Sequence, residues 1–100
     1  MKPSDAIKMR DNAKDEIRAI IERHGFTNAK IFGSVAKGTD KEGSDLDIFV
    51  NKGSRKVSTL DLAELELEIS AVLGVPVQVV TVESTYGDRW AKSYSEAISL

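Results

Sequence analysis

The most constraining segment of this chain is residues 45–50, Asp-Leu-Asp-Ile-Phe-Val, where two acidic residues stand at alternate positions of a short apolar stretch. Successive side chains of a β-strand point to opposite faces, so Asp45 and Asp47 leave one face together. The other face then carries Leu46, Ile48 and Val50. Two carboxylates held about 6–7 Å apart repel each other unless a cation is shared between them. The pattern predicts a half-buried strand that presents a carboxylate pair to a divalent cation, and hard oxygen ligands suit Mg²⁺ bound with a nucleotide phosphate.

A Gly-Ser turn precedes this strand and offers groups that suit a phosphate. Gly33 lets the backbone approach a ligand closely, and Ser34 supplies a hydroxyl and a free N–H at the start of an expected helical turn over residues 35–37. Lys37 adds a positive charge one turn later. Ser44, directly before the aspartates, either bonds a phosphate or simply begins the strand. These residues predict a nucleotide-binding turn that forms the other side of the carboxylate site.

The two segments, residues 32–38 (Phe-Gly-Ser-Val-Ala-Lys-Gly) and residues 44–47 (Ser-Asp-Leu-Asp), resemble the Gly-Ser … Asp-x-Asp signature of the polymerase-β-type nucleotidyltransferase superfamily. In particular, the chain is similar to the minimal nucleotidyltransferase (MNT) proteins, single small domains that often act as antitoxins to HEPN ribonuclease toxins. The resemblance covers nearly the whole chain. Residues 73–80 are similar to the family's third acidic strand, and residues 95–100 look like the end of its C-terminal helix.

Two residues depart from the usual pattern of this family. Lys37 stands where the family more often has Arg, and Gln78 stands where it commonly has a third carboxylate. Gln78 is polar within a valine-rich segment, so we expect its side chain to face the metal site if that segment forms a strand beside residues 45–50. A neutral amide oxygen is a possible third metal ligand, but it cannot act as a base.

The resemblance implies a Mg²⁺-dependent enzyme that transfers AMP from ATP to a hydroxyl group. Asp45 and Asp47 would be its catalytic residues and hold the metal ion. The residues that would bind the nucleoside triphosphate are Gly33, Ser34, Lys37 and Ser44. The implied acceptor is a tyrosine of a partner HEPN toxin, which this chain would silence as its antitoxin. The alternative is a catalytically weak or inactive antitoxin that binds nucleotide and neutralises its partner by binding alone.

Composition narrows the class of protein. One hundred residues suit one domain, spanning residues 1–100, and 41% hydrophobic with 30% charged residues is typical of a soluble globular protein. The sequence shows neither an apolar run of membrane-spanning length nor a signal-peptide pattern, so we expect a cytoplasmic protein that does not contact a membrane. With no cysteine and a single histidine, the chain cannot build a thiol–zinc site or a histidine cluster.

Charge is distributed unevenly along the chain. Residues 1–56 carry twelve Lys and Arg against nine Asp and Glu, whereas residues 57–100 carry two against seven. A strongly basic stripe is missing, so generic nucleic-acid binding is not expected. The acidic second half is either a solvated helix face or a surface that meets a basic protein partner.

Periodicity and turn residues predict a mixed α/β (α+β) fold. A first helix is expected to be capped by Ser4 and ended by Gly25. Residues 58–73 fit both a strand and a helix, but Ser58 or Thr59 as N-cap and Gly74 at the end favour the helix. The expected strands are residues 29–32, 45–50 and 75–82, and the expected final helix is residues 86–100. This order gives a small three-stranded mixed sheet covered by helices, the polymerase-β-like fold that the resemblance also implies.

Three further residues have structural interpretations that compete with functional ones. His24 is expected in the last turn of the first helix, where a partly cationic imidazole suits the helix dipole. Trp90 and Tyr94 lie one turn apart on the final helix and are expected to pack on the core or on a partner. Stacking of these rings on a nucleobase is the lesser alternative.

Overall fold

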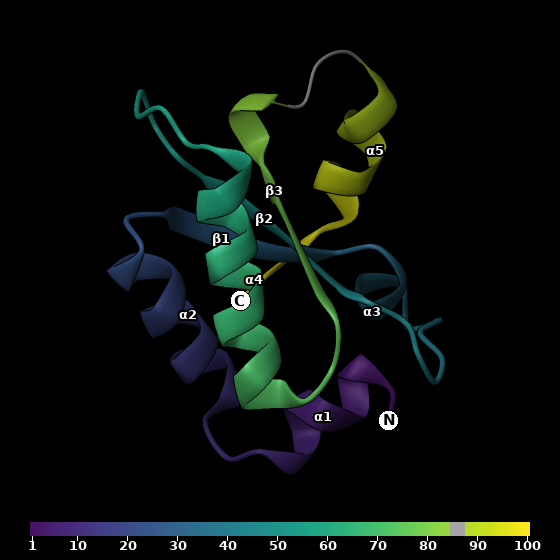
Figure 1. Ribbon diagram of the computed structural model, residues 1–100. Coiled ribbons are helices and arrows are strands. Elements are labelled where there is room, and N and C mark those ends of the chain that lie inside the picture. The colour runs from purple at the N-terminus through teal and green to yellow at the C-terminus, as the bar shows by residue number, and fades with distance from the viewer. Residues whose placement is uncertain (85–87) are drawn as a thin grey trace.

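The computed structural model describes residues 1–84 and 88–100, which form a four-stranded mixed sheet flanked by helices (Figure 1). The strands are β1 (Thr27–Phe32), β2 (Leu46–Asn51), β3 (Val77–Thr81) and β4 (Ile98–Ser99). The helices are α1 (Pro3–Met9), α2 (Ala13–Arg23), α3 (Ser34–Lys37), α4 (Thr59–Leu73), the 3-10 helix η1 (Val82–Ser84) and α5 (Asp88–Glu96). The sheet order is β3-β2-β1-β4, with β1 antiparallel to β2 and β4, and β2 parallel to β3. None of these helices is long and apolar enough to cross a membrane.

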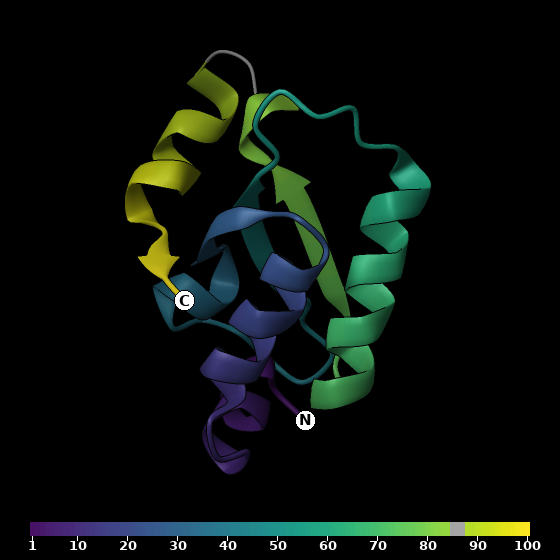
Figure 2. The same cartoon turned by 90° about the vertical axis from the view of Figure 1, so that its left-hand side faces the viewer.

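One face of the sheet packs against α2 and α4 and forms the main core (Figure 2). The β2 side chains on this face are fully buried, as the alternation predicts, and they are Leu46, Ile48 and Val50. They share one cluster with apolar side chains of the two helices, including Ile17, Ile21, Leu65 and Ile69. Burying each such side chain contributes roughly 1.5–3 kcal/mol. The cluster therefore fixes which face of β2 points inward and leaves Asp47 on the other face.

The opposite face of the sheet carries aromatic rings that hold α5. Phe32 and Phe49 stack with their centroids 3.9 Å apart. The Trp90 ring meets both edge-on at 5.9 Å, and the Tyr94 ring lies 5.5 Å from that of Phe49. Lys30 Nζ lies 4.6 Å from the centroid of Tyr94. Trp90 and Tyr94 thus pack on the core, which confirms the structural interpretation of both residues.

The expected single N-terminal helix is wrong, because α1 and α2 are separate helices. Asn12 lies between them with φ of 60°, in the left-handed region that interrupts a right-handed helix. Asn adopts this conformation more readily than most residues. Ser4 is not the expected cap either: α1 begins at Pro3, so Ser4 lies inside its first turn and the N-cap residue is Lys2.

The C-terminal segment also differs from expectation. Helix α5 ends at Glu96, and Ile98 and Ser99 form β4, which pairs with Ile31 and Lys30 of β1. The sheet therefore has four strands rather than three. Pairing with β4 provides hydrogen-bond partners for backbone N–H and C=O groups on one edge of β1. The two strands are far apart in the sequence, so the local pattern of apolar residues does not predict their pairing. The predicted start of the final helix at residue 86 lies outside the described residues.

The ambiguous middle segment is a helix, as its capping residues predict. The Asp61 N–H donates to the Ser58 hydroxyl at 3.1 Å, and the Ser58 N–H donates to the Asp61 carboxylate at 2.9 Å, which completes a capping box. Leu65 and Ile69, one turn apart, are fully buried, whereas Leu67 between them is 71% exposed. The helical interpretation of this segment is confirmed.

Candidate active site

The Gly-Ser turn and the aspartates meet because β1 and β2 are antiparallel neighbours. Phe32, the last residue of β1, pairs with Asp47 near the start of β2. Gly33 follows Phe32 directly, so the antiparallel register carries the turn to the side chain of Asp47. Asp45 stands two residues before Asp47 and is exposed. The structure therefore brings together the two halves of the predicted motif.

Gly33 is a position that only glycine suits. Its φ of 75° and ψ of −148° lie in a region that side-chain-bearing residues essentially do not adopt. A Cβ atom at this position would also lie 2.3 Å from Oδ2 of Asp47. The Asp47 carboxylate thus occupies the space that a side chain at residue 33 would need.

The pKa of the Asp47 carboxyl lies well above its usual value. Burial raises its pKa from 3.8 to about 6, and the negative charge of Asp45 adds to the rise. Among the described residues, neither aspartate side chain has an ion pair or a hydrogen bond that would offset its charge. The protein thus holds a half-buried carboxylate beside a second one and leaves the pair without a positive partner.

These residues fit a hard divalent cation. The described ranges contain no group of three or more His, Cys, Asp and Glu side chains that could hold a metal. A cation at Asp45 and Asp47 would complete its coordination with waters, substrate oxygens or a neutral protein oxygen. Mg²⁺ commonly binds in this way, through one or two carboxylates together with substrate phosphates.

Gln78 stands beside the carboxylate pair in the sheet. The parallel pairing of β2 with β3 places Gln78 in register with Asp47, so the two side chains share a face. Gln78 is exposed, whereas the next residue, Val79, is buried on the core side. Gln78 is therefore not a core residue, and its amide oxygen is a neutral candidate ligand.

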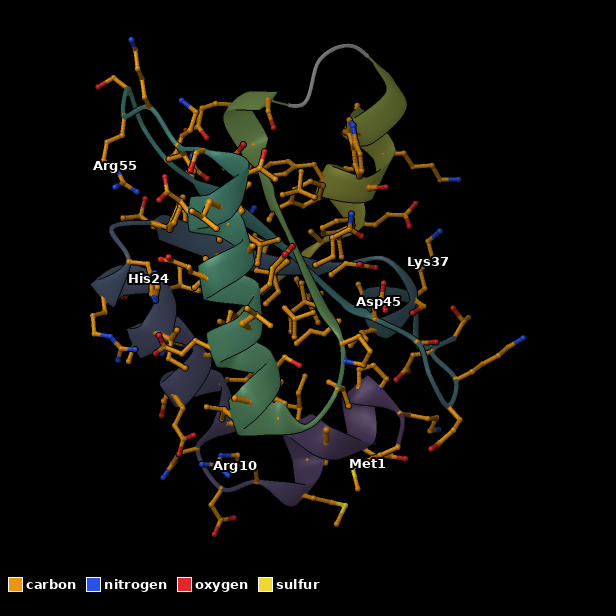
Figure 3. The ribbon with its side chains drawn as sticks, viewed as in Figure 1. Met1, Arg10, His24, Lys37, Asp45 and Arg55 are labelled. Carbon is orange, nitrogen blue, oxygen red and sulfur yellow. The ribbon has the colours of Figure 1, made fainter. Side chains whose placement is uncertain are left out.

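The turn after Gly33 is the short helix α3. The first N–H groups of a helix have no partner within it, so those of Ser34 and its successors are available to a ligand. Gly38 ends the helix in the left-handed conformation with φ of 73°. Lys37 is exposed, and Figure 3 shows it on the same side of the molecule as Asp45.

Ser44 has a local role that the sequence left open. Its hydroxyl accepts the Lys41 N–H at 2.8 Å, and its own N–H donates to the Lys41 carbonyl at 3.0 Å. These bonds close a turn directly before Asp45. The Ser44 hydroxyl proton stays free to donate to a phosphate, so the two interpretations are compatible.

Asp40 supports the loop between α3 and β2, and sequence reasoning missed it. It is 9% exposed, and its carboxylate accepts the Ser4 N–H in the first turn of α1 at 2.9 Å. This backbone hydrogen bond holds the Asp40 pKa below its usual value. The loop is thereby tied to the N-terminal helix, where Met1 also pairs with Glu42. Sequence alone shows only an acidic residue in a polar loop.

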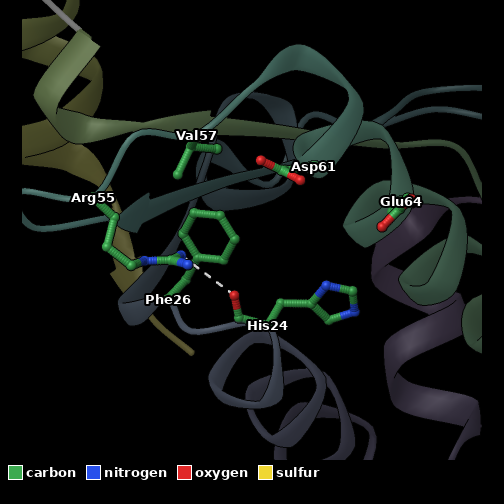
Figure 4. Close-up of a pocket in the computed structure, with 6 residues that line it drawn as sticks. All are labelled: His24, Phe26, Arg55, Val57, Asp61 and Glu64. Carbon is green, nitrogen blue, oxygen red and sulfur yellow. Dashed lines mark hydrogen bonds between the residues drawn. The ribbon is translucent and has the colours of Figure 1, made fainter.

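A second group of polar residues lies at the other end of β1 and β2 (Figure 4). The Arg55 guanidinium lies 4.9 Å from the Phe26 ring centroid and donates to the His24 carbonyl at 3.3 Å. His24 Nε2 is 3.0 Å from a Glu68 carboxylate oxygen. His24 follows the last residue of α2, as predicted, and its contacts give it a structural role.

Comparisons with known proteins agree with this geometry. The family model for the nucleotidyltransferase domain matches residues 14–97. A relative from Methanocaldococcus jannaschii, which carries the name "Putative protein adenylyltransferase", is 45% identical over 87 residues, covering 87% of this chain and 92% of the relative.

Solved structures share the fold. One, described as a "putative minimal nucleotidyltransferase", has a TM-score of 0.79 and 31% identity, and the match covers 94% of this chain and 95% of that one. Another is the complex of a tri-AMPylated Shewanella oneidensis HEPN toxin with an MNT antitoxin, with a TM-score of 0.68 and 16% identity over 87% of this chain and 67% of that one. At that identity the second match shows the fold alone.

Removing the charge of Asp47 should stabilise the protein in the absence of divalent cations. Its pKa is raised from 3.8 to about 6, so the folded state disfavours the carboxylate above that pH. We expect Asp47→Asn to unfold at a higher urea concentration than the wild type at about pH 8. The difference between the two urea midpoints should shrink as the pH falls through 6 towards about 4. Asp11→Asn, an exposed change of equal charge, should show no such gap. Lower stability of Asp47→Asn at pH 8 would contradict this assignment.

Gly33→Ala should damage both stability and ligand binding. Strained backbone of this kind costs roughly 1–3 kcal/mol, and the new Cβ would displace the Asp47 carboxylate. Gly43→Ala is the matched control, because Gly43 has φ of 83° with no atom within 4 Å of its added Cβ. Urea unfolding and amide shifts on titration with Mg²⁺–ATP measure the two effects. We expect Gly43→Ala to lose stability but to keep the amide shifts that Mg²⁺–ATP causes. If the two variants gave the same amide shifts, the close contact between Gly33 and Asp47 would be refuted.

Proposed function

This chain belongs to the nucleotidyltransferase domain family, and on that premise we propose that it transfers AMP from ATP to a protein hydroxyl group. In this reaction the hydroxyl oxygen forms a bond to the α-phosphorus of ATP, the bond from that phosphorus to pyrophosphate breaks with its electron pair leaving on pyrophosphate, and the hydroxyl proton passes to solvent water. The observation that carries the proposal is the Asp45–Asp47 pair beside Gly33, whose negative charge the described residues leave unpaired.

Each residue of the motif has a role in this proposal. Asp45 and Asp47 hold Mg²⁺, and the ion, when bound, neutralises charge on the phosphates and on the leaving pyrophosphate. Close approach of the Gly33 backbone and the free N–H groups of α3 suit the terminal phosphates. The side chains that would add charge or hydrogen bonds to the phosphates are those of Ser34, Lys37 and Ser44.

Removal of the proton from the acceptor hydroxyl is the weak step at this site. Gln78 lies in register with Asp47, but its amide cannot accept the proton. General base catalysis contributes about 10²–10⁴-fold, so binding and orientation of the reactants still leave a slow enzyme. The same observation favours a second candidate function, an antitoxin that binds nucleotide and neutralises its partner by binding alone.

We propose a HEPN toxin as the partner and one of its tyrosines as the acceptor. Support comes from the M. jannaschii relative named for protein adenylyl transfer and from the fold shared with an MNT antitoxin in complex with a tri-AMPylated HEPN toxin. In this proposal residues 1–100 act as one domain in the cytoplasm.

The aspartate pair separates the two candidate functions. Asp45→Asn with Asp47→Asn should abolish the amide shifts that Mg²⁺–ATP causes around Gly33, because the cation loses both charged ligands. The same variant should leave a co-expressed HEPN protein without added AMP, measured by intact mass, while still binding it. Asp5→Asn with Asp11→Asn is the control for loss of two charges. A HEPN protein that the wild type inhibits without modifying would refute the enzyme and support the binding antitoxin.

Gln78→Glu should raise the rate of AMP transfer. A third carboxylate in register with Asp47 supplies both a charged metal ligand and a group able to take the proton, so an increase of about 10²–10⁴-fold is expected. Ser99→Glu on β4 is the control for an added exposed carboxylate. Both variants should fold in the presence of Mg²⁺, because both positions are exposed and the cation offsets the charge added beside Asp47. An unchanged rate in folded Gln78→Glu would show that Gln78 does not limit turnover.

A further inference from the structure

Asp40 is a buried carboxylate in the middle of an otherwise exposed loop. The loop joins α3 to β2, and of residues 37–43, all of which the structure describes, Asp40 alone is buried. Burying a charged group costs free energy unless hydrogen bonds offset the loss of water. The Asp40 carboxylate accepts the Ser4 N–H of α1 at 2.9 Å, so the loop is fixed to α1 at this internal point. Figure 1 shows the loop on the side of the molecule where α1 lies.

Helix α1 lacks a local cap and takes one from this loop. The first N–H groups of a helix have no partner within it, and the side chain of the N-cap residue, Lys2, makes no capping hydrogen bond. Asp40 supplies the acceptor instead, from 36 residues away. The helix is itself held to the core, because Pro3 and Ala6 are buried and Ala6 belongs to the main apolar cluster. Asp40 thus connects the loop, through α1, to the core of the protein.

The loop joins the two halves of the candidate site. On one side of Asp40, the Thr39 N–H donates to the Ser34 carbonyl at 2.9 Å, which ties the loop to α3. On the other side, a hydrogen-bonded turn leads directly to Asp45. Asp45 precedes the first residue of β2 and is exposed, so the loop rather than the sheet sets its position.

We propose that Asp40 is a positioning residue for nucleotide binding: its hydrogen bond to α1 holds the loop so that Asp45 stands beside Asp47 before Mg²⁺ and ATP bind. Asp40 itself touches neither the metal nor the nucleotide, because its carboxylate is engaged by the Ser4 N–H. A metal ligand that is already in place loses less conformational entropy when the cation binds. This inference rests on the proposed function, since it concerns how tightly the same site holds Mg²⁺–ATP.

Removing the acceptor should weaken nucleotide binding in a chain that still folds. We expect Asp40→Ala to raise the Kd for Mg²⁺–ATP, measured by calorimetry, by about tenfold, as is usual for residues that orient metal ligands from outside the coordination sphere. Asp40→Asn keeps an oxygen that can accept the Ser4 N–H, so its Kd should lie closer to that of the wild type. A Kd of folded Asp40→Ala equal to that of the wild type would overturn the inference.

Glu83→Ala is the matched control. The Glu83 carboxylate also accepts loop N–H groups, those of Lys52 and Gly53, both at 3.0 Å. These bonds follow the other end of β2, away from Asp45. Glu83→Ala should therefore lower the urea midpoint of unfolding, as Asp40→Ala does, but leave the Kd for Mg²⁺–ATP unchanged. An equal rise of the Kd in both variants would make Asp40 a general stabilising residue and overturn the inference.

A second measurement needs no variant, and it decides the question even if Asp40→Ala does not fold. Coupling between two binding events is reciprocal. If the Ser4–Asp40 bond strengthens nucleotide binding about tenfold, bound Mg²⁺–ATP should slow hydrogen exchange of the wild-type Ser4 amide by the same factor. The Lys52 amide, which donates to Glu83, should keep its exchange rate. An unchanged exchange rate at Ser4 on addition of Mg²⁺–ATP would overturn the inference.

The outcomes distinguish this inference from the proposed function. Weaker Mg²⁺–ATP binding by Asp40→Ala, together with no AMP transfer to a HEPN protein by the wild type, would uphold the positioning role and refute the enzyme. AMP transfer by the wild type, together with unchanged Mg²⁺–ATP binding by Asp40→Ala, would uphold the enzyme and refute the positioning role. A wild-type protein that does not bind Mg²⁺–ATP would refute both.

Discussion

The approach of the Asp47 carboxylate to the Gly33 backbone is the constraint on which the candidate site depends. The carboxylate fills the space of a missing side chain, with Oδ2 2.3 Å from where a Cβ of residue 33 would stand. This contact requires glycine at the end of β1 and brings the start of α3 to the carboxylate pair. It also accompanies the partial burial that raises the Asp47 pKa. The close approach thus determines the shape of the site, while burial and the charge of Asp45 raise the pKa of Asp47.

Strand β2 carries stabilising apolar side chains on one face and the destabilising charge of the Asp47 carboxylate on the other. Its inward residues anchor the sheet, and on the other face Phe49 is covered by aromatic rings. Asp45 directly precedes the strand, which begins at Leu46 rather than at residue 45, and it is exposed. A carboxylate on a central strand is held more rigidly than one on a loop, which suits a site that must orient a ligand. Folding energy from the core therefore offsets the repulsion at the aspartates, and a bound cation would relieve that repulsion.

Sequence reasoning succeeded where the determining interactions are local. Strand alternation placed Asp47 correctly because side-chain direction repeats every two residues, and the cap at Ser58 identified α4 because its partner lies three residues away. It failed at Asn12, where a turn divides an apparently continuous helical pattern, and at Ile98, whose strand exists only because β1 has an edge to pair. The structural role of Asp40 could not be predicted from the sequence, because its hydrogen-bond partner, the Ser4 N–H, is distant in sequence.

The hydrogen bond from the Val79 N–H to Glu66 has a consequence for solubility at high concentration. β3 is an edge strand of the sheet, and an edge strand with unpaired backbone groups is a template for aggregation with other chains. The Glu66 carboxylate occupies one outward donor near the middle of that strand and places a negative charge beside it. At the other edge, β4 is only two residues long. Both edges thus carry features that oppose the growth of a continuous sheet between molecules.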